Sequence, residues 1–239
     1  MLRTWHYDGG NNKFVLQHTL SGHAGEITGL TTISPGGNGT AGRAPPILWS
    51  GSTDRSIRLW DLTTENCQFL ITSESGATTD GSGGAPTPNA GGSSTAQGQG
   101  QGQGHTEAIT SLLALESPAG NFVLSSSLDG SVKAWNGSNG TCMASEMHGE
   151  GVVSMALATD PKGNPLLLLG LQEGIIMCRS VLQTPTTPAF SFLFALMPRY
   201  TIGHAGPVKS IEAGPASTFY TGGNDGKLLI FQITADLGL

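Results

Sequence analysis

A set of residue types that could perform hydrolysis occurs three times along the chain. Each occurrence has a His, then a Ser or Thr, then an Asp; in chain order they are His23, Ser50 and Asp54, then His105, Ser125 and Asp129, then His204, Thr221 and Asp225. When such groups meet, an imidazole oriented by a carboxylate activates a hydroxyl as a nucleophile. A nucleophile also needs access to substrate and donors that stabilise an oxyanion. Because the set recurs, we expect a structural role for it and predict that the protein is not an enzyme.

Other sequence patterns give no indication of a cofactor or a metal site. Cys67, Cys142 and Cys178 are far apart and form no CxxC pair, which argues against a zinc site or a disulfide framework. The chain has a formal net charge of −6 and only 11 Lys and Arg residues, too few for a basic stripe along a nucleic-acid backbone. We therefore predict no cofactor, no metal and no direct nucleic-acid binding by this segment.

The composition favours an all-β protein. Of 239 residues, 36 are glycine and 12% are charged, so the chain is rich in turns and poor in charge. Its hydrophobic residues form short runs bounded by Gly, Ser, Asp and Asn, a pattern typical of many short strands. The N-terminal sequence MLRTWHYDGG lacks the apolar region of a signal peptide, and the longest apolar stretch, residues 166–169, is too short to span a bilayer. We expect an intracellular protein of the nucleus or cytoplasm that does not bind membranes.

An internal repeat accounts for most of this pattern. Each unit begins with a Gly-His pair, continues with two apolar runs, of which the second ends in Asp, and closes with a run that contains an aromatic residue. The closing aromatic residues of three units are Trp60, Trp135 and Phe231. A fourth, degenerate unit runs from His148 to Ser180, with Glu173 at the Asp position and Arg179 at the Trp position.

The Gly-His pair, the turn Asp and the Trp-Asp pair resemble the WD40 repeat family. This resemblance implies that each unit forms a four-stranded blade of a β-propeller, in which a His, a strand Ser or Thr, the turn Asp and the strand Trp form a buried hydrogen-bonded tetrad. The implied tetrads are His23, Ser50, Asp54 and Trp60; His105, Ser125, Asp129 and Trp135; and His204, Thr221, Asp225 and Phe231. Because Phe231 has no N–H to donate, we expect its blade to be held less firmly.

Insertions explain the uneven spacing of the units. The aromatic positions, with Arg179 in third place, are 75, 44 and 52 residues apart, whereas the WD40 period is about 40 to 45 residues. Residues 73–104 have Ala as their only apolar residue type, and we expect a disordered loop there because such a segment cannot offset its ordering entropy. Residues 34–46 and 182–191 are predicted surface loops, since Pro and Gly interrupt them.

The predicted fold is therefore an all-β, partial WD40 propeller of about four blades, preceded by the last strands of another blade. Its predicted parts are residues 1–20 for the outer strands of the preceding blade, 21–72 for the first blade, 73–104 for the insertion, 105–147 for the second blade, 148–202 for the degenerate blade and 203–239 for the last. Since complete rings avoid exposed blade faces, we expect the remaining blades in a longer protein. Closure of the ring with another chain is the alternative.

A finer resemblance links the chain to plant and green-algal proteins that join a CCCH zinc finger to a WD40 propeller. HTEAITSLLAL, FVLSSSLDGSVKAW and LWSGSTDRSIRLWDLTTENC are similar to the later blades of those proteins. This resemblance implies a zinc finger upstream of Met1, which would make the RNA contacts in place of this chain. The Gly-Gln loop departs from the pattern of those proteins.

The WD40 resemblance implies a non-catalytic scaffold that binds a protein or peptide partner. The loops that carry the Gly-His pair and the turn Asp are expected to lie on one face, where a partner would bind. The residues predicted on this face are Glu26, Thr53, Arg55, Glu107, Leu128, Glu150, Asn224 and Lys227. The alternative function is an RNA-associated regulatory factor of the CCCH zinc finger and WD40 type.

Overall fold

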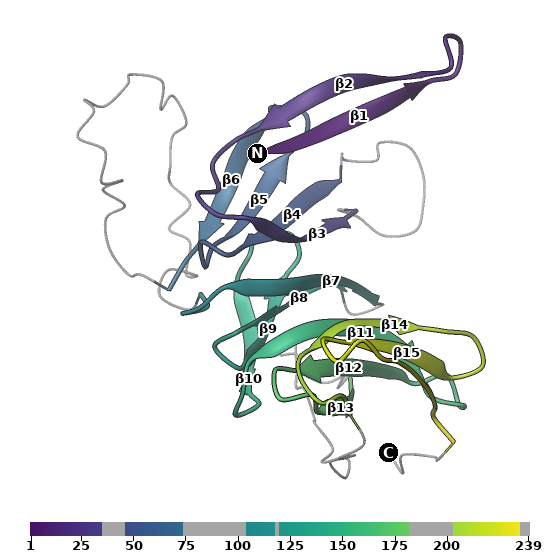
Figure 1. The fold of residues 1–239 in the computed structure, drawn as a ribbon. Helices are drawn as coiled ribbons and strands as arrows, with labels where there is room; N and C mark the ends of the chain where they lie inside the picture. Colours follow the sequence, from purple (N-terminus) through teal and green to yellow (C-terminus); the bar gives the residue numbers. More distant parts are fainter. Residues whose placement is uncertain (35–45, 74–103, 118–119, 182–202, 235–239) are drawn as a thin grey trace.

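The computed structural model describes residues 1–34, 46–73, 104–117, 120–181 and 203–234. These residues form five antiparallel sheets, and no helix lies among them (Figure 1). The sheets are, in chain order, β1 (Leu2–Asp8) with β2 (Lys13–Leu20); β3 (Ile27–Ile33), β4 (Ile47–Ser52), β5 (Ile57–Asp61) and β6 (Asn66–Ile71); β7 (Ile109–Ser117), β8 (Gly120–Ser127), β9 (Ser131–Asn136) and β10 (Cys142–Met147); β11 (Val152–Thr159), β12 (Pro165–Leu171) and β13 (Ile176–Ser180); and β14 (Val208–Ala213), β15 (Thr218–Gly223) and β16 (Leu228–Gln232). Within each sheet, every strand pairs with the next one along the chain.

The position of a strand in its sheet explains its residue pattern. The middle strand β12 is a nearly continuous apolar run, and residues 166–171 are all buried because both faces of the strand are covered. The outer strand β6 instead alternates exposed and covered side chains, as a strand with one solvated face does. Middle strands therefore carry the core, and outer strands border on solvent.

Consecutive sheets share hydrophobic cores. The first strands make the contacts: β3 packs on β7, β7 on β11 and β11 on β14, so the sheets follow one another from β1 and β2 at the top of Figure 1 to β14 and β15 at the lower right. Trp49 of β4 and Leu112 of β7 lie in one core, and Leu124 of β8 and Leu169 of β12 lie in the next. The β1–β2 hairpin packs on the β3–β6 sheet through Leu20.

This architecture confirms the predicted all-β class. The sheets β3–β6 and β7–β10 have four strands each, as propeller blades do, and the described parts of the other two units have three. Residues 35–45, 74–103 and 182–202, which contain most of the predicted loops, lie outside the described residues. No helix in the described part of the chain is long and apolar enough to cross a membrane.

Candidate functional site

The first His, Ser and Asp set meets where β4 turns into β5. Ser50 lies on β4, Trp60 on β5, Asp54 in the turn between them, and His23 in the segment before β3. His23 Nδ1 lies 2.9 Å from Asp54 Oδ2, and His23 Nε2 lies 2.7 Å from Ser50 Oγ. The indole N–H of Trp60 donates to Ser50 Oγ over 2.8 Å. The four side chains implied by the WD40 resemblance thus form one connected network.

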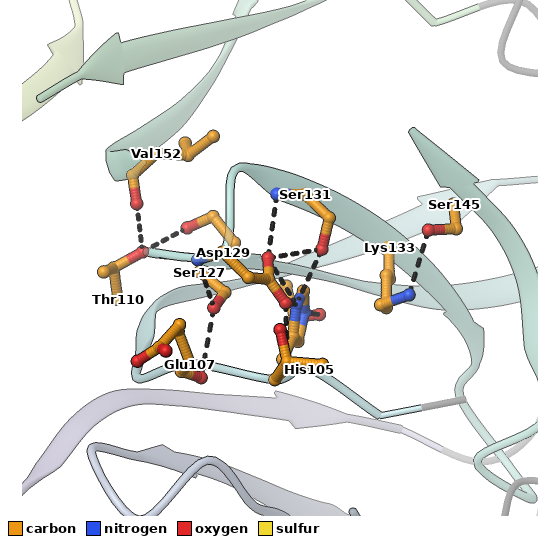
Figure 2. Close-up of polar contacts among 12 residues, drawn as sticks. His105, Glu107, Thr110, Ser127, Asp129, Ser131, Lys133, Ser145 and Val152 are labelled. Atoms are coloured by element: carbon orange, nitrogen blue, oxygen red, sulfur yellow. Dashed lines mark hydrogen bonds and ion pairs between the residues drawn. The ribbon is translucent and has the colours of Figure 1, made fainter. Parts of the chain in front are cut away.

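The second set forms the same network in the β7–β10 sheet. His105 Nδ1 lies 3.1 Å from Asp129 Oδ2, and His105 Nε2 lies 2.7 Å from Ser125 Oγ. Trp135 donates its indole N–H to Ser125 Oγ over 2.8 Å. Figure 2 shows His105 and Asp129 facing each other beneath the turn between β8 and β9. The corresponding distances differ by at most 0.2 Å between the two units, so the repeat reproduces the geometry as well as the residue types.

The indole N–H sets the direction of this chain of hydrogen bonds. Because Ser125 Oγ accepts a proton from Trp135, we assign the hydroxyl proton of Ser125 to the bond with His105 Nε2, which then accepts. The ring proton of His105 is left on Nδ1, where it is donated to the Asp129 carboxylate. The arrangement therefore requires a neutral imidazole and an ionised carboxylate.

A further serine in each of these two networks was missed by the sequence reasoning. Ser131 Oγ lies 2.9 Å from His105 Nδ1 and donates to Asp129 Oδ1 over 2.6 Å. Ser56 makes the corresponding contacts in the first network. A sequence signal existed, because both serines stand two positions after the turn Asp. The third set has Lys227 at this position.

The third network lacks both the indole bond and the contacts of the further serine. His204 Nδ1 lies 2.8 Å from Asp225 Oδ1, and His204 Nε2 lies 2.9 Å from Thr221 Oγ1. Phe231 takes the Trp position and stacks on Phe219, with ring centroids 4.9 Å apart. An apolar ring fills the space of the indole but donates no hydrogen bond to the Thr221 hydroxyl.

The pKa values agree with this assignment of charges. Burial acts to raise the pKa of Asp129, but hydrogen bonds from His105, Ser131 and the Thr106 backbone N–H outweigh it and hold that pKa below its usual range. Hydrogen bonds also outweigh burial at Asp225 and lower its pKa to about 2. Burial lowers the pKa of His105 in spite of the carboxylate beside it. At neutral pH, a neutral imidazole therefore faces an ionised carboxylate.

The surroundings of the hydroxyl groups argue against nucleophilic catalysis. Ser50 and Ser125 are fully buried, and each hydroxyl already bonds both an indole and an imidazole. A substrate could not reach these oxygens without breaking the network and opening the core. We interpret the three networks as partners for polar groups that the turns would otherwise bury unpaired.

The degenerate unit lacks this network. His148 occupies the His position and is buried, but Leu169 stands at the Ser position and cannot bond it. Arg179, at the Trp position, is also buried. Glu173, at the turn Asp position, is exposed, and its backbone N–H donates to Glu150 Oε2 over 2.7 Å. A charged guanidinium therefore replaces an indole in the interior of this unit.

Glu146 of β10 completes this charged group and was not identified from the sequence. Burial raises the pKa of its carboxyl to about 7, and the positive charge of Arg179 limits the rise. Burial and the charge of Arg179 together lower the pKa of His148 to about 4. The replacement of Trp by Arg in a buried position was the available signal, because a buried cation is expected near a carboxylate.

The predicted binding face is built by one backbone hydrogen bond that recurs in four units. In each unit, the turn after the second strand donates an N–H to the loop before the first strand; the pairs are Thr53 to Glu26, Leu128 to Ala108, Gln172 to Gly151 and Asn224 to Pro207. The two loops predicted to share a face are thus joined within every unit. Of the eight predicted face residues, Glu150 is half-buried, and the others are exposed.

No group of three or more His, Cys, Asp or Glu side chains in the described part of the chain is arranged to hold a metal ion. The three cysteines are half-buried free thiols, and burial raises the pKa of each of them. Thiolate chemistry at neutral pH is therefore disfavoured at these positions.

Comparison with known proteins identifies the repeats. Residues 14–61 and 99–136 match the family model described as WD domain, G-beta repeat. The computationally designed Ika4 protein, known from a crystal structure, is similar to the chain with a TM-score of 0.56 at 18% identity, over 91% of this chain and 98% of Ika4. The designed Ika8 protein is similar with a TM-score of 0.55 at 19% identity, over 92% of this chain and 50% of Ika8.

At this identity, the designed proteins bear on the fold alone. No curated protein matches the chain, and the findings give no support to the finer resemblance to CCCH zinc finger proteins. The family match covers the first two tetrads, where the residue pattern is complete. The chain therefore contains a WD40 repeat domain, with all-β sheets of the kind that form propeller blades.

Proposed function

We propose that this chain is a non-catalytic scaffold whose loop face binds a protein or peptide partner. WD40 repeat domains are typically non-catalytic and generally serve as protein-interaction scaffolds. The observation that carries the proposal is the backbone hydrogen bond that joins the two exposed loops in each of four units. Loops held on a rigid sheet scaffold offer a binding surface that loses little entropy when a partner docks.

The side chains on this face favour a partner with polar and charged groups. Glu26 and Glu107 are exposed carboxylates, while Arg55 and Lys227 are exposed cations on the first and last units. Leu128 is the exposed apolar residue between them. Opposite charges at separate positions let the face select the orientation of a bound segment, since a reversed segment would meet like charges.

Paired charge reversals test this proposal. Arg55→Glu with Lys227→Glu changes two cations on the face, and Lys13→Glu with Lys162→Glu makes the same change in charge at exposed positions outside the face. Affinity capture followed by mass spectrometry of the bound proteins should show partners lost by the first pair and kept by the second. Identical partner lists for the wild type and both double variants would contradict the proposal.

The RNA-associated function is the second candidate, and it depends on the finer resemblance to CCCH zinc finger proteins. Sequencing of the transcript 5′ of Met1 tests it directly. An encoded CCCH motif together with further blades would favour the RNA function, and a transcript without them would remove its support. The described residues contain few exposed cations to bind RNA themselves, since the whole chain has 11 Lys and Arg.

A further inference from the structure

One shape-complementary contact recurs between consecutive sheets. A β-branched side chain at the start of a first strand points at a glycine in the second strand of the preceding sheet. A Cβ added to Gly51 would lie 2.5 Å from Ile109 Cγ2, and one added to Gly170 would lie 2.7 Å from Val208 Cβ. Both distances are shorter than two carbon atoms that are not bonded can approach, so the next sheet occupies the space beside these glycines, and we call each of them a socket. At Gly170 the Ser154 hydroxyl of the same sheet lies closer still, 2.4 Å from the added Cβ. A larger residue is excluded at these positions because the neighbouring side chain occupies the space that its Cβ would need.

A hydroxyl beside each socket bonds the backbone of the incoming residue. Thr28 Oγ1 donates to the Ile109 carbonyl over 2.6 Å, and Ser154 Oγ donates to the Val208 carbonyl over 2.7 Å. Between the second and third sheets, Ser126 stands in place of the glycine, but Thr110 Oγ1 donates in the same way to the carbonyl of Val152 over 2.7 Å (Figure 2). Each interface thus combines an inserted side chain with a hydroxyl-to-carbonyl hydrogen bond.

In the β3–β6 sheet, the residue at the inserting position, Ile27, has no glycine of another described sheet to receive it. Ile109 is fully buried, as are its counterparts in the two later sheets, but Ile27, at the same position in β3, is only half-buried. Three residues further along the strand, the exposed fraction differs more. Leu112 of β7 is 5% exposed, whereas its counterpart in β3, Leu30, is 53% exposed.

The last sheet carries the socket half without a side chain to fill it. Gly222 follows the tetrad residue of β15, as Gly51 and Gly170 follow their counterparts in β4 and β12. A Cβ added to Gly222 would meet only the Ser210 hydroxyl within 4 Å. Ser210 itself is exposed at the position of Ser154, and its hydroxyl makes no hydrogen bond to another described residue.

Two exposed apolar side chains of the outer strand β16 lie beside this socket. Leu228 and Ile230 of β16 are 68% and 66% exposed, and register places them beside Gly222 and Tyr220 on one face of the sheet. Exposed large apolar residues grouped on one sheet face are typical of an interface. The two ends of the row of sheets therefore present complementary surfaces to solvent.

We propose that the face of Ser210, Gly222, Leu228 and Ile230 on one copy docks onto the Ile27 and Leu30 face of a second copy. The occupant is a second copy because both halves of a contact that recurs inside the chain are exposed on the same molecule. Ile27 enters the Gly222 socket, and the Ser210 hydroxyl donates to the Ile27 carbonyl. Such a contact joins two different faces and is head-to-tail.

Complementation between two variants tests this arrangement. Leu30→Lys places a charge on the face of Ile27 and Leu30 and leaves the face of Gly222 and Leu228 unchanged. Leu228→Lys places the charge on the second face and leaves the first unchanged. In sedimentation velocity over a range of concentrations, wild type should associate, and each variant alone should remain monomeric, with Kd raised about tenfold or more. An equimolar mixture of the two variants should form a 1:1 dimer that does not grow further, because each supplies one intact face.

Two further variants keep the test decisive. Met147→Lys places the same charge at an equally exposed apolar position outside both faces and should associate like the wild type. Gly222→Val fills the socket, where the exposed Ser210 hydroxyl, 2.9 Å from the added Cβ, must turn aside. This variant should therefore fold, with a thermal melt close to that of the wild type, and remain monomeric. A wild-type protein that stays monomeric at its highest soluble concentration would overturn the proposal. Failure of the folded variants to complement would also overturn it.

Discussion

The β7–β10 and β11–β13 sheets share one hydrophobic core but treat their buried polar groups differently. In the first, Ser125 links His105 to an indole, and all three side chains are neutral. In the second, His148 and Arg179 are buried without that hydroxyl link. Both sheets nevertheless have the same strand order and a register shift at the same place in the first strand. The apolar pattern therefore suffices to form the sheet, and the tetrad is an addition to it.

The tetrad adds hydrogen bonds at the turn of the sheet that carries it. In β7–β10 the Asp129 carboxylate accepts hydrogen bonds from two backbone N–H groups, a hydroxyl and an imidazole. In β11–β13 the exposed Glu173 makes no such network, and the loop before the strand is linked to the turn through Glu150 instead. We expect the tetrad to raise stability at the turn, and the degenerate unit to be the weaker of the two.

The largest expected effect comes from Asp129→Ala. This substitution leaves His105, Ser131 and the Thr106 N–H without their acceptor, and we expect it to lower the free energy of unfolding by about 1 to 3 kcal/mol. Its counterpart Glu173→Ala removes an exposed side chain and should change stability by less than about 0.5 kcal/mol. Chemical denaturation of both variants measures the difference. Equal losses in the free energy of unfolding for the two variants would contradict the proposed difference between the two turns.

A smaller loss is expected from Trp135→Phe. The ring is retained in part, but the hydrogen bond to Ser125 is lost, at a cost of about 1 kcal/mol beyond the change in packing. Trp49→Phe is the matched control, since Trp49 is fully buried and its indole N–H has no partner among the described residues. Thermal melts should show the larger destabilisation for Trp135→Phe. A reversed order would remove the energetic role assigned to the indole bond.

The smallest expected effect is the pH dependence that Glu146 adds. Its pKa of about 7 in the folded protein lies above the ordinary value of 4.5. The carboxyl therefore contributes stability that is fully present below pH 4.5 and is lost as the pH rises through about 7. Glu146→Gln should thus gain stability relative to the wild type between pH 4.5 and pH 8.

Denaturation at several pH values measures this gain. Glu116→Gln makes the same chemical change at an exposed strand position. The stability of this variant relative to the wild type should not rise between pH 4.5 and pH 8. A gain of equal size in both variants would show that burial of Glu146 is not the cause.

The resemblance to the WD40 family allowed much of the tetrad geometry to be predicted. His, Ser or Thr, Asp and Trp are ordered alike along the chain, and the structure brings the members of each set within hydrogen-bonding distance in two complete networks. Ser131 was missed because its signal, a serine two positions after the turn Asp, occurs in only two of the units and is common in turns. Glu146 was missed because its partner Arg179 is 33 residues away in the chain and belongs to another sheet.

The strands and their order could be predicted from local alternation and a repeated spacing, and the tetrad residues from the resemblance to the WD40 family. The way in which the sheets fit together became visible in the three-dimensional structure alone. Gly51 and Gly222 each follow the Ser or Thr of a tetrad, yet Ile109 of another sheet fills the space at Gly51, and only the Ser210 hydroxyl of the same sheet lies near Gly222. A socket is defined by the atoms that approach it from another sheet, and no local pattern carries that information.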